Sequence, residues 1–407
     1  MLLGIAALPI GALYVWRTLI VPAATGVVPG DFSENYMAAA AKVAAGRDPY
    51  DLCIIRGCVV PPGTHVLTPL PLAGAQYVTP PPLAWMLQPL VGMDPRFQLA
   101  VLIGVLQLSL IVFLWCALRA VDARDWQLGL LLVLVAIGFE PVIGNVDEGQ
   151  VNLVLLGLSG IWLLAWVAGD RWWGGMALGA AVAIKLLQAP LGLLLIWGRR
   201  WMMVLAAALT GTALWLLAVP QYMPEYIFKV APVLTAGTGL FENHSPGGML
   251  VRLFDPATFL GAARETSPAA RVITAAIALL ALGLTFWVLR RPGPERHSRA
   301  LEAAAIVAVG PLVASYSWGT HLVLLLLPML VLIAWAVRRR DWVVVGLVAL
   351  GWLLIGPGHK WFQTLLVTGY SNLLVLRLMA EFGVVGITSI WIASLLAVRR
   401  ERASGRS

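Results

Sequence analysis

Long apolar runs with few charged residues dominate this chain and restrict what it can fold into. They lie at residues 1–22, 97–118, 127–143, 151–168, 173–185, 188–198, 201–219, 269–289, 300–316, 320–337, 341–356 and 379–398. A helix needs about 20 apolar residues to cross a bilayer, whereas a barrel strand needs only about 10. Hydrophobic residues make up 60% of the chain and charged residues 12%, roughly half the charged fraction of a soluble protein. We therefore expect an all-α, polytopic membrane protein with about 12 transmembrane helices.

Two neighbouring runs, 173–185 and 188–198, are each too short to be an ordinary span. Lys185, Gln188 and Pro190 lie between them or at their ends, and proline interrupts a helix. We predict two short helices that meet at a break around Lys185. Helices broken at membrane depth need a polar cavity or other protein around them.

The positions of the basic residues support this arrangement. With the N-terminus in the cytoplasm, the inner connections are 118–126, 169–172, 198–201, 290–302, 338–341 and the tail from 399. They contain 16 of the 28 Lys and Arg residues but only 7 of the 20 Asp and Glu residues. Basic residues collect in short cytoplasmic loops, and a single span over 173–198 would move the later basic loops to the other side. The net charge of +8 is therefore an orientation signal and does not indicate binding to nucleic acid.

Two long segments, 23–96 and 220–268, then lie on the outer side with the short loops 142–150, 317–320 and 357–378. Most of the unusual polar residues of the chain are in these segments. We expect one membrane-embedded unit, residues 1–407, whose outer loops 23–96 and 220–268 form a catalytic face. On an oxidising outer face, Cys53 and Cys58 are either a disulfide pair that closes a small loop or two free thiols.

The segment 29–50 follows the first apolar run and carries its first carboxylate, Asp31. Gly30 gives the backbone freedom to turn before it. Beyond Asp31, the residues Asn35, Tyr36, Ala39, Ala40 and Val43 fall at helical spacing, which predicts an amphipathic helix on the membrane surface. Asp31 is either the N-cap of this helix or an acid at the mouth of a site.

Several short motifs stand in order on the predicted outer face. They are GDFxxxY at 30–36, AAGRDPYD at 44–51, YVTPPP at 77–82, GQVN at 149–152, Lys185 with Pro190, ENHSPGGMLVRLF at 242–254 and SYSWGTH at 315–321. In this order and on this side, they resemble glycosyltransferase family 87, the polyprenyl-phosphate-mannose-dependent mannosyltransferases with a GT-C fold. The mycobacterial phosphatidylinositol-mannoside mannosyltransferases belong to that family. The resemblance covers about residues 29–321.

The resemblance implies a multi-pass enzyme of the cytoplasmic membrane whose active site faces outward. It would transfer a sugar, most simply mannose, from a polyprenyl-phosphate donor to a lipid-linked or cell-envelope glycan, with inversion and with Asp31 as the general base. Inverting transfer needs a carboxylate on the acceptor side, and the leaving phosphate needs cations or hydrogen-bond donors. The outer acids form no recognisable D-x-D pattern, so we expect a metal-independent reaction without a cofactor. The expected partners are the donor, the glycolipid acceptor and membrane lipids, with the protein a monomer.

Candidate ligand-binding residues follow from the same motifs. For the donor phosphate or sugar they are Lys185, His321, Arg252, Asn243, Ser245 and Tyr77; for the acceptor they are Asn35, Tyr36, Gln150, Asn152 and Glu34. Each has a structural alternative. Lys185 and Arg252 are also suited to anchor at the interface, Asn243 and Ser245 to cap a short helix at 246–254, and Tyr77 to join an aromatic belt. Glu34 and Asp51 are the other carboxylates if Asp31 only caps a helix.

Two other functions fit parts of the pattern. A flippase or transporter of lipid-linked sugars would use broken helices and buried cations, but it does not explain why an acid, aromatic residues and amides gather on one face. A glycan polymerase or ligase with a diphosphate-linked donor would need more basic residues near the phosphates than this sequence supplies. A transferase that uses a monophosphate donor fits best.

Overall fold

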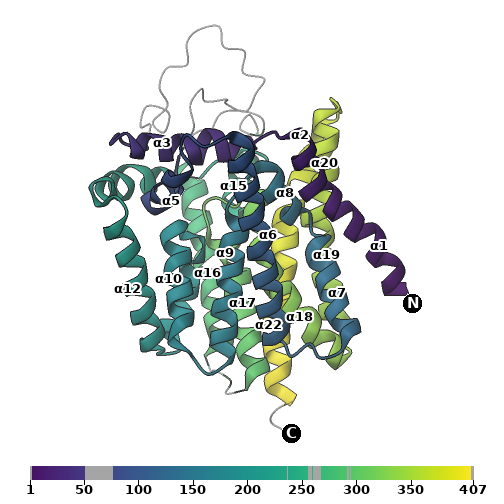
Figure 1. Ribbon diagram of the computed structural model, residues 1–407. Coiled ribbons are helices and arrows are strands. Elements are labelled where there is room, and N and C mark those ends of the chain that lie inside the picture. The colour runs from purple at the N-terminus through teal and green to yellow at the C-terminus, as the bar shows by residue number, and fades with distance from the viewer. Residues whose placement is uncertain are drawn as a thin grey trace.

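The computed structural model describes residues 2–50, 77–235, 237–254, 259, 267–290, 293 and 295–404. Within these ranges the protein is helical and contains no strand. The long helices stand side by side in one bundle, and a layer of short helices covers one of its ends (Figure 1). The chain ends at the opposite end of the bundle, whereas the N-terminus lies beside the bundle at the free end of α1 (Figure 1). The all-α expectation is therefore confirmed.

The helices of the bundle follow the predicted apolar runs closely. They are α1 (Leu2–Val15), α6 (Pro95–Ala120), α7 (Trp126–Ile137), α9 (Asn152–Val167), α10 (Trp172–Ile184), α11 (Ala189–Trp197), α12 (Trp201–Leu217), α16 (Pro268–Leu289), α17 (Arg296–Val313), α18 (Leu326–Arg339), α19 (Trp342–Leu353) and α22 (Phe382–Ser404). The span that contains α18 is the most enclosed, since 83% of its apolar window is buried. α1 lies at the edge of the bundle (Figure 1).

Six helices in the described ranges are long and apolar enough to cross a membrane, and the number rises to eight if each bent helix pair is one span. α9, α10 and α11 are apolar but shorter than an ordinary span. The protein is thus a multi-pass membrane protein by the length and composition of its helices. The expected number of about 12 crossings stays a prediction.

Short helices form the layer at one end of the bundle. They are η1 (Trp16–Ile20), α2 (Val21–Thr25), η2 (Asp31–Met37), α3 (Ala38–Ala44), α5 (Pro81–Leu87), η3 (Gln88–Leu90), α8 (Glu140–Glu148), η5 (Pro220–Tyr222), α13 (Met223–Glu225), η6 (Tyr226–Val230), α14 (Ala231–Thr235), α15 (Pro246–Phe254), η8 (Gly319–Leu325), η9 (Leu354–Gly358), α20 (His359–Val367) and α21 (Leu373–Ala380). α3 lies across the bundle end (Figure 1). The apolar face expected for residues 30–50 is buried there: Tyr36, Ala39, Ala40 and Val43 are each less than 9% exposed.

The predicted break at Lys185 is present. α10 ends at Ile184, and Lys185 has an extended backbone with φ −158° and ψ 132°. The turn η4 (Leu186–Gln188) follows and leads into α11 at Ala189. Lys185 is therefore an extended residue between two helices and belongs to neither of them.

The basic connections meet one another at the end of the bundle that lies away from α3. Their contacts join segments far apart in the sequence: Arg296 with the carbonyl of Ala120, Arg338 with the carbonyl of Asp122, Arg299 with Asp170, Arg339 with Glu401 and Arg402 with Glu302. The expected grouping of the basic loops on one face is therefore confirmed. Asp31, Lys185, Arg252 and Glu381 belong to the opposite layer of short helices and loops.

Candidate active site

Asp31 opens the π-helical segment η2, and its carboxylate faces side-chain amides. Oδ1 accepts a hydrogen bond from Asn35 Nδ2 at 2.8 Å, and Oδ2 accepts one from Gln150 Nε2. The N-cap position of this segment is Gly30, and it makes no side-chain capping bond. Since the carboxylate bonds to amide side chains from two different segments, its arrangement is not that of a helix cap.

Lys185 joins the same group of side chains from the break after α10. Its Nζ donates to Gln150 Oε1 at 3.2 Å and to Asn152 Oδ1 at 3.0 Å. Tyr36, a buried residue of η2, donates its hydroxyl to the same oxygen of Gln150 at 2.6 Å. A carboxylate and an ammonium thus lie on either side of one amide, in a group that η2, the 149–152 turn and the break at Lys185 build together.

The backbone of this group depends on Gly149 rather than on Gly30. Gly149 ends α8 in the left-handed region, with φ +73°, a conformation that favours glycine. A Cβ at this position would lie 2.7 Å from Cβ of Phe32 and 2.8 Å from Cβ of Pro29. Gly30 has φ −58° and no neighbouring atom in the way of a Cβ. The close approach at Gly149 brings Gln150 within reach of Asp31.

Other charged groups surround the pair. The negative charges of Asp31 and Glu148 are close enough to interact electrostatically with the ammonium of Lys185. The ammonium of Lys185 is in turn close enough to interact with the imidazole of His321. Glu242, in the loop before α15, is half-buried; this burial and the nearby charge of Asp31 raise the pKa of its carboxyl group. His321 Nδ1 is buried without a hydrogen-bond partner among the described residues. A buried polar atom without a partner is costly unless a ligand or water satisfies it.

Arg252, Asn243 and Ser245 form a separate structural cluster. The guanidinium of Arg252 makes two 2.8 Å bonds to Glu381 and donates to the carbonyls of Leu240 and Asn243. Asn243 donates to the carbonyls of Thr238 and Ser315 and accepts from the amides of Ser245 and Ser317. These contacts tie the loop before α15 to residues 315–317.

Ser245 caps the helix expected at 246–254. Its Oγ accepts a bond from Gly248 N at 3.0 Å, and α15 runs from Pro246 to Phe254. Asn243 uses both ends of its amide in the bonds above. The capping role given as the structural alternative for Ser245 is therefore confirmed. Arg252 is buried and paired with Glu381 rather than anchored at an interface, and Asn243 joins two loops rather than capping the helix.

The remaining predicted residues differ in their surroundings. Tyr77 is buried, and its hydroxyl donates to the carbonyl of Pro80 and accepts from the amide of Ala84, so it fixes the turn into α5. Glu34 is exposed, whereas Asn35 is held by Asp31. Asp51 and the two outer cysteines, Cys53 and Cys58, lie outside the described residues.

Sequence reasoning did not single out His244, His359 or Glu242. The two imidazoles are buried and meet edge to face with ring centroids 4.6 Å apart. Burial and the neighbouring charges of His359 and Arg252 hold the pKa of His244 well below its usual range. A signal existed for two of the three, since Glu242 and His244 belong to the ENHSPGG motif. The pairing of His244 with His359 joins positions more than 100 residues apart and was not readable from the sequence.

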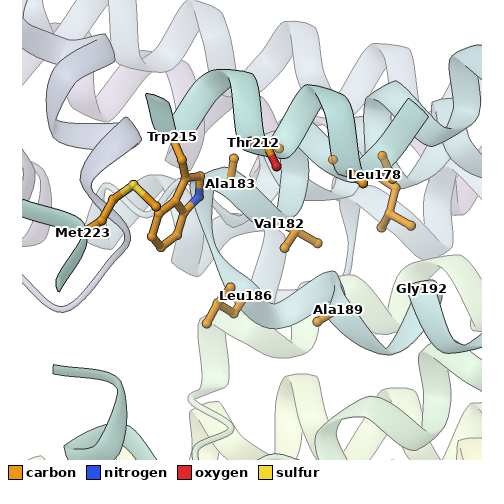
Figure 2. Close-up of a pocket in the computed structure, with 13 residues that line it drawn as sticks. Leu178, Val182, Ala183, Leu186, Ala189, Gly192, Thr212, Trp215 and Met223 are labelled. Carbon is orange, nitrogen blue, oxygen red and sulfur yellow. The ribbon is translucent and has the colours of Figure 1, made fainter. Parts of the chain in front are cut away.

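An apolar groove runs beside the break at Lys185. Its volume is about 420 Å³, and Leu186, the residue after Lys185, lines it. The walls come from α10, α11 and α12, with Trp215 and Met223 together at one end and Gly192 further along α11 (Figure 2). Glycine and alanine of α10 and α12 line the groove, among them Gly179, Ala183, Ala207, Ala208 and Gly211. Gly179 also lets the two helices approach closely, since a Cβ there would lie 2.3 Å from the carbonyl oxygen of Ala207.

No group of three His, Cys, Asp or Glu side chains in the described part of the chain is arranged to hold a metal ion. The chemistry visible in this layer is therefore that of a carboxylate, an ammonium and several amides beside an apolar groove. A carboxylate in such a place is able to accept a proton, and an ammonium is able to bind a phosphate.

Comparison with known proteins gives a family match over the middle of the chain. Residues 77–315 match glycosyltransferase family 87. A polyprenol-phosphate-mannose-dependent alpha-(1-2)-phosphatidylinositol pentamannoside mannosyltransferase from Mycobacterium tuberculosis is 27% identical over 244 residues, which cover 55% of this chain and 52% of the relative. The protein of the same name from Mycolicibacterium smegmatis is 31% identical over 169 residues, 38% of each chain.

A third relative, also from Mycolicibacterium smegmatis, is described as a polyprenol-phosphate-mannose-dependent alpha-(1-2)-phosphatidylinositol mannoside mannosyltransferase. It is 29% identical over 244 residues, 56% of this chain and 52% of the relative. The chain spans about half the length, or less, of the curated relatives it matches.

Proposed function

The chain belongs to glycosyltransferase family 87, and on that premise we propose that it transfers a mannosyl group from a polyprenyl-phosphate donor to a glycolipid acceptor. The relatives described as polyprenol-phosphate-mannose-dependent mannosyltransferases support the choice of donor and sugar. The observation that carries the proposal is the group Asp31–Gln150–Lys185, in which a carboxylate and a cation flank one amide.

In this proposal Asp31 is the general base. Its carboxylate is half-buried and is oriented by two amide donors, so it keeps a lone pair for an acceptor hydroxyl. The acceptor O–H gives its proton to Asp31 while the oxygen forms a bond to the anomeric carbon. The bond from that carbon to the phosphate oxygen breaks, and polyprenyl phosphate leaves as an anion. Attack opposite to the leaving group inverts the anomeric carbon.

Lys185 is the proposed partner of the donor phosphate. Its ammonium bonds only to neutral amide oxygens among the described residues, and a phosphate oxygen is a stronger acceptor than an amide oxygen. His321, with its buried and unbonded Nδ1, is the second group that we propose to bind the donor. Lys185 neutralises charge on the leaving phosphate, so we also propose that transfer needs no metal ion and no cofactor. Arg252 bonds to Glu381 and to two backbone carbonyls, so we do not include it in this proposed site.

The apolar groove supports a donor with a long hydrocarbon chain. Lys185 and Leu186 are adjacent, and Leu186 lines the groove. A lipid whose phosphate lies at Lys185 would therefore enter the groove with its first isoprene units. In a bilayer this chain moves from lipid hydrocarbon into the groove, so van der Waals packing against α10, α11 and α12 would set its contribution to affinity.

We further propose a GT-C fold and a site that faces outward from the cytoplasmic membrane, with the basic connections in the cytoplasm. The polar groups gather in the layer of short helices at one end of the bundle, near α3 (Figure 1), which supports a transferase over a transporter with a binding site at the bilayer midplane. Both substrates would meet at this surface, and we expect the monomer to suffice.

The proposal is tested with purified protein in detergent or nanodiscs. The donors are polyprenyl phosphates that carry mannose, glucose or arabinose, the acceptor is a phosphatidylinositol mannoside, and products are identified by mass. We expect a mass increase of one hexose with the mannose donor and full activity in the presence of a metal chelator. No product with any donor would refute the proposed reaction, and a product only with another sugar would correct the donor.

A further inference from the structure

Gln150 is bonded on both sides of its amide. Nε2 donates to Asp31 Oδ2, while Oε1 accepts from Lys185 Nζ at 3.2 Å and from the Tyr36 hydroxyl at 2.6 Å. An amide oxygen has two lone pairs, and here both are in use. The orientation of the amide follows from its partners, because a rotated amide would turn its NH₂ group toward the ammonium of Lys185 and its oxygen toward the carboxylate.

Asp31 and Lys185 carry opposite charges but make no direct ion pair among the described contacts; only the width of the Gln150 amide separates them. Opposite unit charges within a few ångströms of each other attract strongly when bulk water does not screen them. The two charged groups would therefore bond to each other if nothing stood between them. In a direct pair the carboxylate would be a weaker base, and the ammonium would be less available to a phosphate.

We propose that Gln150 is a positioning residue that orients Asp31 and Lys185 toward their substrates and keeps them from pairing with each other. This inference rests on the proposed function, in which Asp31 accepts a proton and Lys185 binds phosphate. Glutamine suits this role because it is neutral and has a donor for the carboxylate and an acceptor for the ammonium. A carboxylate at this position would bind Lys185 itself and repel Asp31.

Two neighbours fix the amide in its place. The close approach of Gly149 to Pro29 and Phe32 sets the backbone, and the buried hydroxyl of Tyr36 holds the oxygen. Tyr36 and Gln150 therefore hold Asp31 and Lys185 in position, rather than binding the acceptor directly. Glu148 on α8 and Glu242 before α15 also interact electrostatically with Asp31. Both residues are still present when Gln150 is replaced, so they do not account for a difference between the variants.

Two substitutions separate the spacing role from the hydrogen-bonding role. Gln150→Leu keeps the bulk of the side chain but removes the amide, so Asp31 and Lys185 each lose a hydrogen-bond partner but stay apart. Gln150→Ala removes the bulk as well, so Lys185 is able to reach Asp31. We expect kcat to drop about tenfold in both variants. The affinity for polyprenyl phosphate should fall in the Ala variant and stay near the wild-type value in the Leu variant.

Gln107→Leu is the matched control. Gln107 also accepts a bond from a tyrosine hydroxyl, that of Tyr14 at 2.5 Å, but on α6 and away from Asp31. We expect unchanged kcat and unchanged affinity for polyprenyl phosphate in this variant, and thermal unfolding verifies that all variants are folded. An equal loss of affinity in the Leu and Ala variants would overturn the spacing role.

A binding measurement tests the inference without catalysis. The affinity for polyprenyl phosphate should fall about tenfold in Gln150→Ala, because Asp31 then competes with phosphate for Lys185. The double variant with Asp31→Asn should recover wild-type affinity, since a neutral amide does not compete. An affinity that stays low in the double variant would contradict the inference. If wild-type protein binds the lipid but transfers no sugar, the proposed function is contradicted. The affinities of the Gln150 variants then still test whether Gln150 keeps Asp31 and Lys185 apart.

Discussion

Replacing Asp31 with asparagine removes the proposed base while changing the shape of the site very little. The carboxylate accepts one bond from Asn35 and one from Gln150. Asparagine keeps an acceptor for Gln150, and the Asn35 amide is free to rotate and present its oxygen to the new NH₂ group. Gln150 itself is not free to rotate, because Lys185 and Tyr36 hold its oxygen.

The expected magnitudes differ strongly for folding and for catalysis. Two charge-assisted hydrogen bonds become neutral ones, which lowers stability by about 1–2 kcal/mol in total. A general base contributes about 10²–10⁴-fold to the rate, equivalent to about 3–5 kcal/mol of the barrier at 1.36 kcal/mol per tenfold. Asp31→Asn should therefore remain folded and bind polyprenyl phosphate, yet transfer mannose at least about 100-fold more slowly.

The control is an aspartate that does cap a helix. Asp94 is the N-cap of α6, and its carboxylate accepts bonds from the backbone amides of Arg96 and Phe97. Asparagine caps helices about as well as aspartate, so Asp94→Asn should leave stability and transfer near the wild-type values. Single-turnover transfer and thermal unfolding of both variants complete the comparison. Transfer by Asp31→Asn within about threefold of wild type would refute the base assignment and turn attention to Glu34 and Asp51.

Three further predictions concern packing, the lipid groove and orientation. Arg252→Ala strands a carboxylate and two carbonyls, so the free energy of unfolding should fall by about 3 kcal/mol or more; unchanged thermal stability would contradict its structural role. Gly192→Leu fills the groove at a position with no atom within 4 Å, and it should raise KM for a long-chain donor but not for one with two or three isoprene units. Gly283→Leu, equally open but outside the groove, is its control, and equal effects of both would argue against the groove. In a variant without native cysteines, Ala45→Cys should react with an impermeant maleimide in intact cells and Arg124→Cys should not; the reverse pattern would invert the proposed orientation.

The sequence by itself determined the helices and the grouping of their connections. Apolar periodicity and helix breakers act over a few neighbouring residues, so the runs, the break at Lys185 and the helix from Pro246 to Phe254 were readable without a structure. The alternation of basic loops also correctly grouped them on one end of the bundle. Ser245 as a cap followed from the same local chemistry.

Tertiary structure alone decided which polar groups meet. Arg252 looked as suited to phosphate as to anchoring, until the fold brought it to Glu381, 129 residues away. Gly30 looked like the required glycine, but the requirement is at Gly149, because only the packed chain brings Phe32 against it. Gln150 stands between Asp31 and Lys185 through contacts that span 119 and 35 residues. Contacts at these separations depend on how the helices pack, and local composition carries no record of that packing.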